Sequence, residues 1–309
     1  MTQETYGERD FARTDDLRVV HERLLSWYAA NARDLPWRRT RDPYRILVSE
    51  VMLQQTQVER VIPAYEAFLS RFPTIEHLAA APLAEVIAAW GGLGYNRRAV
   101  YLWRAARQIV EQHGGEFPRD RRQLEELPGV GRYTAGAVLC FAFGQPVAFW
   151  DTNIARVLTR IFLGPDHSPR RRDLDALAER VLPLDRAYEW NQALMELGAR
   201  VCTSRSPRCE QCPVRAVCRS VGTVGMVRRR SERFAGSRRY YRGRIVAALR
   251  RLPAGVSLHA LRELVGDPDS AGGELALEEL VEGLARDGLV EVREEGGEYF
   301  VRLPGKPAD

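Results

Sequence analysis

Lysine is almost absent from this sequence of 309 residues: the one example is Lys306, close to the end. An enzyme that forms a Schiff base with its substrate needs a lysine or an N-terminal amine as the nucleophile. Codon bias in a GC-rich genome explains most of the replacement of lysine by arginine, but the chemical consequence is the same. The body of the chain has no lysine for that chemistry.

Long hydrophobic runs are also missing. No uninterrupted apolar segment approaches the roughly 20 residues that cross a bilayer, which excludes an integral membrane protein. The N-terminal segment MTQETYGERDFARTDD is polar and lacks the apolar core of a secretory signal. We therefore expect a cytoplasmic protein without a signal peptide.

Charge is unevenly distributed along the chain. The net charge of +5 and the pI of about 9.1 favour an anionic partner. Residues 245–309 contain 7 Lys+Arg and 13 Asp+Glu, a net of −6, while residues 1–244 contain 39 and 28, a net of +11. This asymmetry predicts two functional units.

Helical periodicity dominates the chain up to Val221, where Pro and Gly separate short helical stretches. Strand alternation first becomes convincing near residue 289, in LVEVREEGGEYFVRL, where Gly296-Gly297 predicts a hairpin turn. Three helices are predicted before this hairpin, an order typical of a winged-helix domain. These helices are Ile245–Leu252, Ser257–Val265 and Leu275–Asp287.

The patterns predict a mainly α chain in four parts. An N-terminal arm covers 1–14 and a helical region covers 15–227. A basic linker at 228–244, with eight arginines and one glutamate, separates it from a winged-helix-like α+β domain at 245–309.

Four of the five cysteines fall within 17 residues, and these are Cys202, Cys209, Cys212 and Cys218. Thiolates at such short spacing can surround one metal centre. Disulfides are disfavoured because nothing marks the chain as secreted. Zinc sites usually have two close cysteine pairs, whereas this segment has one, so an iron–sulfur cluster is favoured and zinc is the competing interpretation.

The segment Leu127-Pro128-Gly129-Val130-Gly131 predicts a sharp turn that opens a helix. The exposed amide groups at a helix start bind phosphate well. A tight turn explains the pattern equally well on its own, but in a basic helical chain it favours binding of a nucleic-acid backbone.

Three acidic residues, Glu50, Asp151 and Glu196, stand in mostly apolar segments. A carboxyl group in apolar surroundings can stay protonated and act as an acid. A helix cap or an internal salt bridge is the preferred explanation for each one singly, and Asp151 would make an ordinary N-cap.

Six motifs occur here in one order, and together they carry a family resemblance. They are LPWR (35–38), SEVMLQQTQV (49–58), GLGY (92–95), LPGVGRYTAGA (127–137), DTNIARVL (151–158) and the four-cysteine loop. Over roughly residues 17–220 the chain resembles the adenine DNA glycosylase (MutY-type) branch of the helix-hairpin-helix, iron–sulfur DNA glycosylases. The resemblance implies a [4Fe-4S] cluster and excision of adenine mispaired with 8-oxoguanine or guanine. It also implies a six-helix lobe at about 42–148 and an iron–sulfur lobe at about 15–41 and 149–220, with DNA between them.

Catalytic roles follow from the resemblance by position. Glu50 would protonate adenine N7 in a base flipped out of the duplex, and ionised Asp151 would stabilise the positively charged sugar. Asn153 would orient this centre. Tyr133 stands where lyase relatives carry a Schiff-base lysine, which implies base excision without strand cleavage.

DNA-contacting roles are implied in the same way. Trp37, Arg38 and Glu196 would line the adenine pocket. Gln55 and Tyr95 would wedge into the base stack and hold the gap open.

The remaining implied contacts concern the opposite strand and the backbone. Thr56 would lie near the opposite base, and the turn from Gly129 to Gly131 would grip phosphates beside the lesion. The expected partner is double-stranded DNA with A·8-oxoG or A·G mispairs, bound by a nucleoid-associated monomer.

Two departures from the family are visible. Thr152 stands where the family commonly has glycine. Well-known members carry a β-rich C-terminal domain that reads 8-oxoguanine, whereas this tail is short, acidic and winged-helix-like. Because phosphate contacts need Lys or Arg, we expect residues 228–244 to touch DNA more than the wing does.

Three alternatives compete with adenine excision. A thymine/uracil mismatch DNA glycosylase of the same superfamily would not need an acid aimed at N7, so Glu50 disfavours it. A bifunctional lyase like endonuclease III is disfavoured by the lack of lysine. A redox-sensing DNA-binding regulator is disfavoured by the acidic wing.

Overall fold

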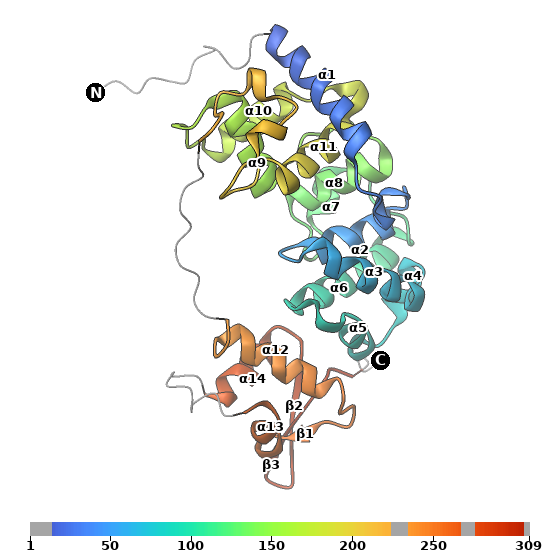
Figure 1. Cartoon of the computed structure of the whole chain (residues 1–309). Coiled ribbons are helices and arrows are strands. Elements are labelled where there is room, and N and C mark those ends of the chain that lie inside the picture. The colour runs from blue at the N-terminus through green and yellow to red at the C-terminus, as the bar shows by residue number, and fades with distance from the viewer. Residues whose placement is uncertain (1–13, 224–233, 267–275, 306–309) are drawn as a thin grey trace, which may run out of the picture. The chain divides into compact units, whose positions relative to one another are not determined.

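A computed structural model describes residues 14–223, 234–266 and 276–305 (Figure 1). The predicted arm, apart from Thr14, lies outside the described residues, as do 228–233 of the predicted linker and Lys306. Residues 14–223 contain helices and no strand, as the helical periodicity predicted. None of the described helices is both long and apolar enough to cross a membrane.

The described chain contains fourteen α-helices, short helical turns and three strands, with these bounds. The α-helices are α1 (Thr14–Asn31), α2 (Pro43–Leu53), α3 (Val58–Arg71), α4 (Ile75–Ala80), α5 (Leu83–Ala89), α6 (Arg97–His113), α7 (Arg121–Glu125), α8 (Arg132–Phe143), α9 (Thr152–Leu158), α10 (Arg171–Arg180), α11 (Ala187–Arg200), α12 (Arg238–Leu249), α13 (Leu258–Val265) and α14 (Leu277–Arg286). The short turns are η1 (Pro36–Arg38), η2 (Gly91–Leu93), η3 (Thr159–Leu163), η4 (Leu184–Arg186), η5 (Cys209–Gln211) and η6 (Arg215–Val217), and the strands are β1 (Val256–Ser257), β2 (Glu291–Glu295) and β3 (Glu298–Arg302).

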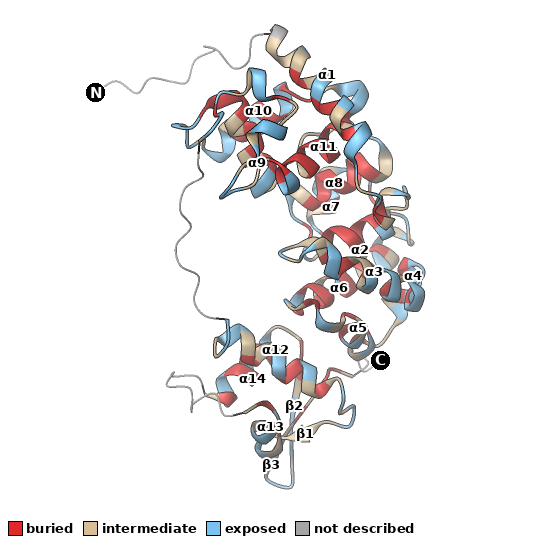
Figure 2. Ribbon diagram, viewed as in Figure 1, coloured by how far each residue is buried: buried red, intermediate tan, exposed pale blue. Residues whose placement is uncertain are grey.

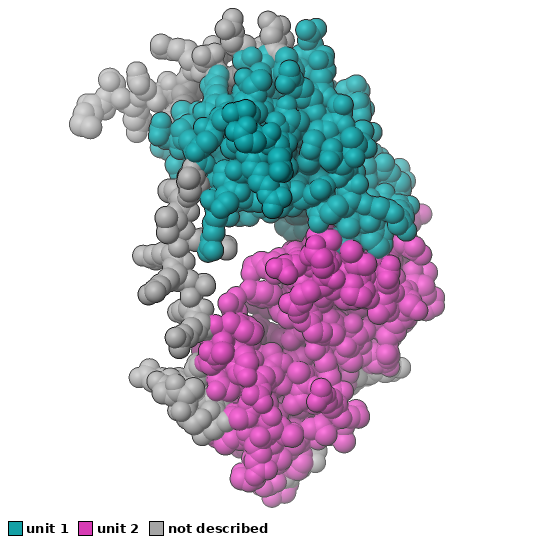
Figure 3. Space-filling view, in the orientation of Figure 1, with its two compact units in different colours: residues 1–43, 119–121, 131–229 teal, residues 44–118, 122–130, 230–309 magenta. Residues whose placement is uncertain are grey.

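The chain forms two compact units (Figure 3). Unit 1 contains residues 1–43, 119–121 and 131–229, and unit 2 contains 44–118, 122–130 and 230–309. The predicted six-helix lobe at about 42–148 included α8 together with α2–α7. In the structure, α8 belongs to unit 1. The predicted division into four parts stays a prediction.

The core of unit 1 is built around α8 and α11. Every residue of α8 from Thr134 to Phe141 is buried, so most of this helix is red in Figure 2. Gly136 permits this packing, because a Cβ at that position would lie 2.6 Å from the Cβ of Phe149. Cys140 is fully buried on the same helix, as expected of a core residue, and burial raises the pKa of its thiol to about 11.

The C-terminal part of unit 2 has the element order α12, β1, α13, α14, β2, β3. Its antiparallel sheet has the strand order β1-β3-β2, and β2 and β3 are joined at Gly296-Gly297. The predicted hairpin and the winged-helix-like fold class are therefore confirmed. The two-residue strand β1 is an addition, because so short a strand shows no alternation in sequence.

Helix α12 begins at Arg238 and not at Ile245, so part of the predicted linker is helical. Ser237 caps the helix, since its hydroxyl accepts a hydrogen bond from the Tyr240 amide at 3.3 Å. Arginine is also a good helix former, which lets an arginine-rich segment continue the helix. Charge alone had suggested an irregular segment.

Candidate functional site

Glu50 lies in the last turns of α2, in unit 2, and is 4% exposed. The residues on both sides of it are buried as well, so the carboxyl group has little access to water. Burial in apolar surroundings penalises the charged form of a carboxyl group. The structure thus puts Glu50 in the environment that its sequence neighbours indicated.

Arg98 of α6 organises the chain just after Glu50. Its Nη1 donates hydrogen bonds of 2.8, 2.8 and 2.6 Å to the carbonyl oxygens of Val51, Met52 and Gln54, near the end of α2. Its Nη2 donates to Thr56 Oγ1 at 3.0 Å. These bonds satisfy carbonyl groups that the end of a helix leaves unpaired. Burial lowers the pKa of Arg98 to about 10.

The same guanidinium reaches the turn that carries Tyr95. Arg98 donates to the carbonyl oxygens of Gly94 at 3.1 Å and of Tyr95 at 3.4 Å. One buried side chain therefore fixes the turn with Gln55 and Thr56 and the turn with Tyr95. The structure brings these three predicted DNA contacts of unit 2 onto a common support.

Gln55 and Tyr95 share an uncommon backbone conformation. With φ of 55° and 45°, they are the non-glycine residues of the described chain that have positive φ. Tyr95 is 41% exposed, and Gln55 is also exposed. Such conformations cost about 1–3 kcal/mol and concentrate at functional sites, so they support a role for these two side chains. Their wedging role stays a prediction.

Asp151, in unit 1, is the N-cap of α9, as its ordinary structural explanation predicted. Its Oδ1 accepts from the amides of Asn153 at 2.9 Å and Ile154 at 2.8 Å, and its Oδ2 accepts from Asn153 Nδ2 at 3.0 Å. The carboxylate is held in one orientation by three donors. A cap of this kind does not exclude a second role, because each carboxylate oxygen has more than one acceptor site.

Asn153 connects Asp151 to the cysteine loop through a residue that the sequence did not single out. Arg156 donates to Asn153 Oδ1 at 3.0 Å, to the Cys202 carbonyl oxygen at 2.9 Å and to the Gly198 carbonyl oxygen at 2.9 Å. Arg156 lies one helical turn after Asn153. This spacing in the sequence could have indicated a contact between the two side chains. Asn153 therefore orients Asp151 and is itself oriented by Arg156.

Tyr133 lies in the first turn of α8, in unit 1. Its hydroxyl donates to the Met195 sulfur at 3.8 Å, and its ring packs edge-to-face on Phe149 with centroids 5.4 Å apart. A tyrosine at this position has no amine, so it cannot form a Schiff base.

Arg38 and Glu196, both predicted for the adenine pocket, meet in a buried ion network in unit 1. Glu196 is 0% exposed and accepts from Arg38 Nη2 at 2.8 Å and from Arg33 Nε at 2.7 Å. Burial alone would raise the pKa of Glu196, but the hydrogen bonds from Arg33 and Arg38 lower it below its usual value. Trp37, beside Arg38 on η1, is also buried. Their contact with adenine stays a prediction.

The two glycines of the predicted backbone grip have different structural requirements. Gly129 has φ of +77°, and a Cβ there would lie 2.7 Å from the Cβ of Tyr101. Gly131 is the N-cap of α8, with φ of −98°, and a Cβ there would meet nothing within 4 Å.

Replacing Gly129 with alanine is therefore expected to lower the free energy of unfolding by roughly 1–3 kcal/mol, from strain and overpacking. The matched variant Gly131→Ala should cost less than about 1 kcal/mol, the effect of alanine at an N-cap. Denaturant unfolding of both variants measures the difference. Equal losses would contradict the assignment of strain to Gly129.

The four clustered cysteines lie in one loop of unit 1, and none of them forms a disulfide. Burial is the main cause that raises the pKa of Cys212 to about 11, and the other three cysteines add to this shift, so the four thiols lie within electrostatic reach of one another. Arg160 Nη1 donates to Cys202 Sγ at 3.4 Å.

These residues fit an iron–sulfur cluster. In the described part of the chain, no three His, Cys, Asp or Glu side chains are grouped closely enough to hold a single metal ion. A cluster of several irons is wider than one ion and does not need its thiolates to converge on one point. When bound, it would cross-link the loop through all four cysteines.

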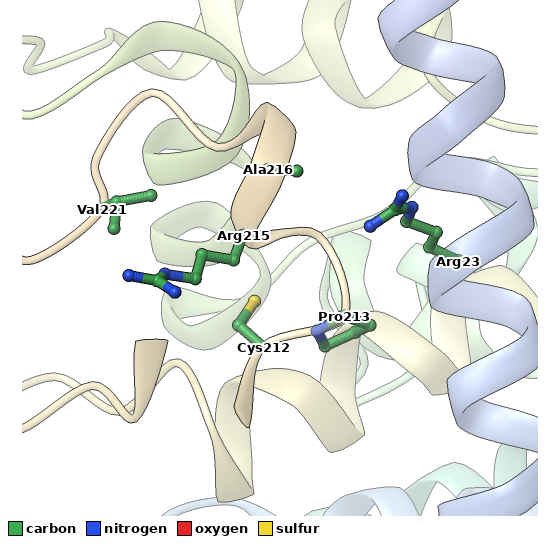
Figure 4. Close-up of a pocket in the computed structure, with 6 residues that line it drawn as sticks. All are labelled: Arg23, Cys212, Pro213, Arg215, Ala216 and Val221. Carbon is green, nitrogen blue, oxygen red and sulfur yellow. The ribbon is translucent and has the colours of Figure 1, made fainter. Parts of the chain in front are cut away.

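A surface pocket of about 380 Å³ opens beside this loop (Figure 4). Arg23 projects toward it from α1, across from the side chains of the loop. None of the predicted catalytic acids lines it. Its lining residues are Arg23, Cys212, Pro213, Arg215, Ala216 and Val221.

Comparisons with known proteins agree with these observations. Residues 48–183 match the family model of the HhH-GPD superfamily base excision DNA repair proteins, and residues 202–218 match the iron–sulfur binding domain of endonuclease III. The second match confirms the predicted iron–sulfur cluster, and its range runs from Cys202 to Cys218. The role of each of the four cysteines as a ligand stays a prediction.

Among the relatives, an adenine DNA glycosylase of Mycolicibacterium smegmatis is 46% identical over 88% of this chain and 93% of its own length. An alignment over 88% of the chain must include part of residues 245–309, because these residues make up more than the remaining 12%. A thymine/uracil-DNA glycosylase of Methanothermobacter thermautotrophicus is 35% identical over 68% of this chain and 96% of its own length. Among solved structures, a thermostable thymine-DNA glycosylase has a TM-score of 0.62 and 35% identity, and the match covers 66% of this chain and 95% of that one.

The resemblance read from the six motifs is confirmed by the extent of these matches. The chain belongs to the adenine DNA glycosylase family, within the HhH-GPD superfamily of base excision DNA repair proteins.

Proposed function

We propose that this protein excises adenine mispaired with 8-oxoguanine or guanine from duplex DNA, acting as a monomer and without cleaving the strand. The observation that carries the proposal is the buried Glu50 on α2, followed directly by the strained turn at Gln55. The adenine DNA glycosylase relative supports it further, since its match extends into the C-terminal region while the thymine/uracil relative covers only 68% of the chain.

The proposed mechanism uses Glu50 as the general acid. Transfer of its proton to N7 of a flipped-out adenine makes the base a better leaving group. Breaking the N-glycosidic bond leaves an oxocarbenium-like sugar with positive charge. Water then adds to the sugar carbon and loses one proton, which the Glu50 carboxylate accepts, so the general acid is restored and no covalent intermediate is needed.

Asp151 is the proposed anionic partner. Its carboxylate, fixed by Asn153 and Ile154, would stabilise the positive charge on the sugar without reorganising during the reaction. Arg38, Trp37 and Glu196 are proposed for the adenine pocket, with Glu196 acting through the orientation that it gives to Arg38.

The test is a single-turnover assay on four duplexes that contain A·8-oxoG, A·G, T·G or U·G. We expect release of adenine from the first two and no release of thymine or uracil. Release of thymine without adenine would contradict the proposal and favour the mismatch glycosylase that acts on pyrimidines.

Borohydride treatment during turnover tests the absence of lyase chemistry. We expect no trapped protein–DNA adduct, because Tyr133 stands where an amine would be needed. A trapped adduct would show that the enzyme also uses an imine.

A further inference from the structure

Arg239 and Tyr240 in the first turn of α12, with Phe234 just before the helix, lie in unit 2 together with Tyr95, which Arg239 contacts. The guanidinium of Arg239 donates to the Tyr95 hydroxyl and lies 5.7 Å from the centroid of the Tyr95 ring. It also lies 5.9 Å from the ring of Phe234, which packs edge-to-face on Tyr240 with centroids 5.8 Å apart. We call these four residues the arginine–aromatic patch.

The patch is open to solvent. Phe234 is 59% exposed and Tyr95 is 41% exposed, and Arg239 is also exposed. Exposed apolar side chains that adjoin one another mark binding surfaces more often than single ones do. Arginine between aromatic rings is a combination that binds nucleic acid with little sequence preference, because the cation meets phosphate and the rings meet bases.

The patch is also held in place. Arg250, just after α12, donates to the Ile87 carbonyl oxygen at 3.1 Å and to Asn96 Oδ1 at 2.9 Å, and burial lowers its pKa to about 10. Asn96 directly follows Tyr95 in the chain. The C-terminal region is thus anchored to the turn that carries the proposed wedge, at Arg250 as well as at Arg239.

Charge separates α12 from the rest of the C-terminal region. Residues 234–252 contain no aspartate or glutamate, and the acidic residues that the structure describes in the rest of the region lie on α13, on α14, at its C-cap Asp287 and in the β2–β3 hairpin. The net negative charge of the tail therefore does not describe the surface beside Tyr95.

We propose that the arginine–aromatic patch is a DNA-binding surface, with Arg239 contacting a backbone phosphate of the duplex beside Tyr95. The inference rests on the proposed function in one respect, because it takes Tyr95 to face DNA. A guanidinium has five N–H donors, and the bond to Tyr95 uses one of them. The C-terminal region then contributes to DNA binding through α12 and not through its wing.

The test compares two variants of the full-length protein with its cluster bound, Arg239→Gln and Arg251→Gln. Arg251 is exposed after the same helix, so both variants remove one positive charge from the same region. Affinity for one A·8-oxoG duplex is measured across salt concentrations. Loss of a phosphate contact should reduce the slope of log affinity against log salt by about 1 for Arg239→Gln, whereas Arg251→Gln should keep the wild-type slope.

Two further variants separate charge from stacking. Arg239→Lys should restore most of the slope because it keeps the positive charge. Phe234→Ala should weaken binding on the order of ten-fold at an unchanged slope, since a ring contributes stacking and no charge. A wild-type slope for Arg239→Gln, or the same reduction in Arg251→Gln, would overturn the proposal.

The outcome can be told apart from failure of the proposed function. If the wild-type protein releases adenine and the two variants have equal slopes, the proposed DNA-binding role of the patch is wrong and the proposed glycosylase activity stands. If Arg239→Gln has a reduced slope and the wild-type protein releases no base, the patch binds DNA but the proposed activity is wrong.

Discussion

Replacing Glu50 with glutamine is expected to lower the single-turnover rate of adenine release by about 10²–10⁴-fold, the usual contribution of a general acid. Glutamine keeps the size of the side chain but has no acidic proton to give to N7. Binding of the A·8-oxoG duplex should change little, because the substitution leaves the proposed wedge and backbone contacts in place.

Glu59→Gln is the matched control for this variant. Glu59 is exposed in the first turn of α3, so the same chemical change there should leave the rate of base release at the wild-type level. Wild-type turnover by Glu50→Gln would remove Glu50 from the mechanism, and loss of duplex binding in that variant would show that it acts mainly through structure.

Replacing Arg98 with methionine is expected to lower the free energy of unfolding on the order of 3 kcal/mol. The change leaves the carbonyl groups of Val51, Met52 and Gln54 without the donor that they share. Denaturant unfolding measures the loss. Because the same guanidinium holds the turns of Gln55 and Tyr95, the rate of base release should fall as well.

Arg97→Met supplies the control for Arg98. Arg97 is its neighbour in sequence, has a side chain that is 55% exposed, and makes an ion pair with Asp287 at 3.4 Å. A pair this exposed contributes at most about 1 kcal/mol. Equal destabilisation by the two variants would contradict the supporting role of Arg98.

The contrast between Glu50 and Arg98 shows how far sequence reasoning extends. The burial of Glu50 could be predicted because its apolar neighbours and its motif are adjacent in the chain. The iron–sulfur cluster could be predicted for the same reason, since the four cysteines are close in sequence. The role of Arg98 depends on carbonyl groups 44 to 47 residues earlier, which only the folded chain brings together. The pair Arg97-Arg98 after GLGY gives no sign of this.

The C-terminal region gives a second example. The hairpin at Gly296-Gly297 has a strong local signal, and it was predicted correctly. The arginines of residues 228–244 predicted a DNA contact there, but the contact of Arg239 with Tyr95 joins residues 144 positions apart, and only the folded chain brings them together.

The central claim is that Glu50 delivers a proton to N7 of adenine. Its most direct test compares single-turnover release of adenine and of 7-deazaadenine, in which a carbon replaces N7, each placed opposite 8-oxoguanine. The account predicts that both duplexes bind with similar affinity and that only adenine is released at an appreciable rate. Release of 7-deazaadenine at the rate of adenine would contradict it.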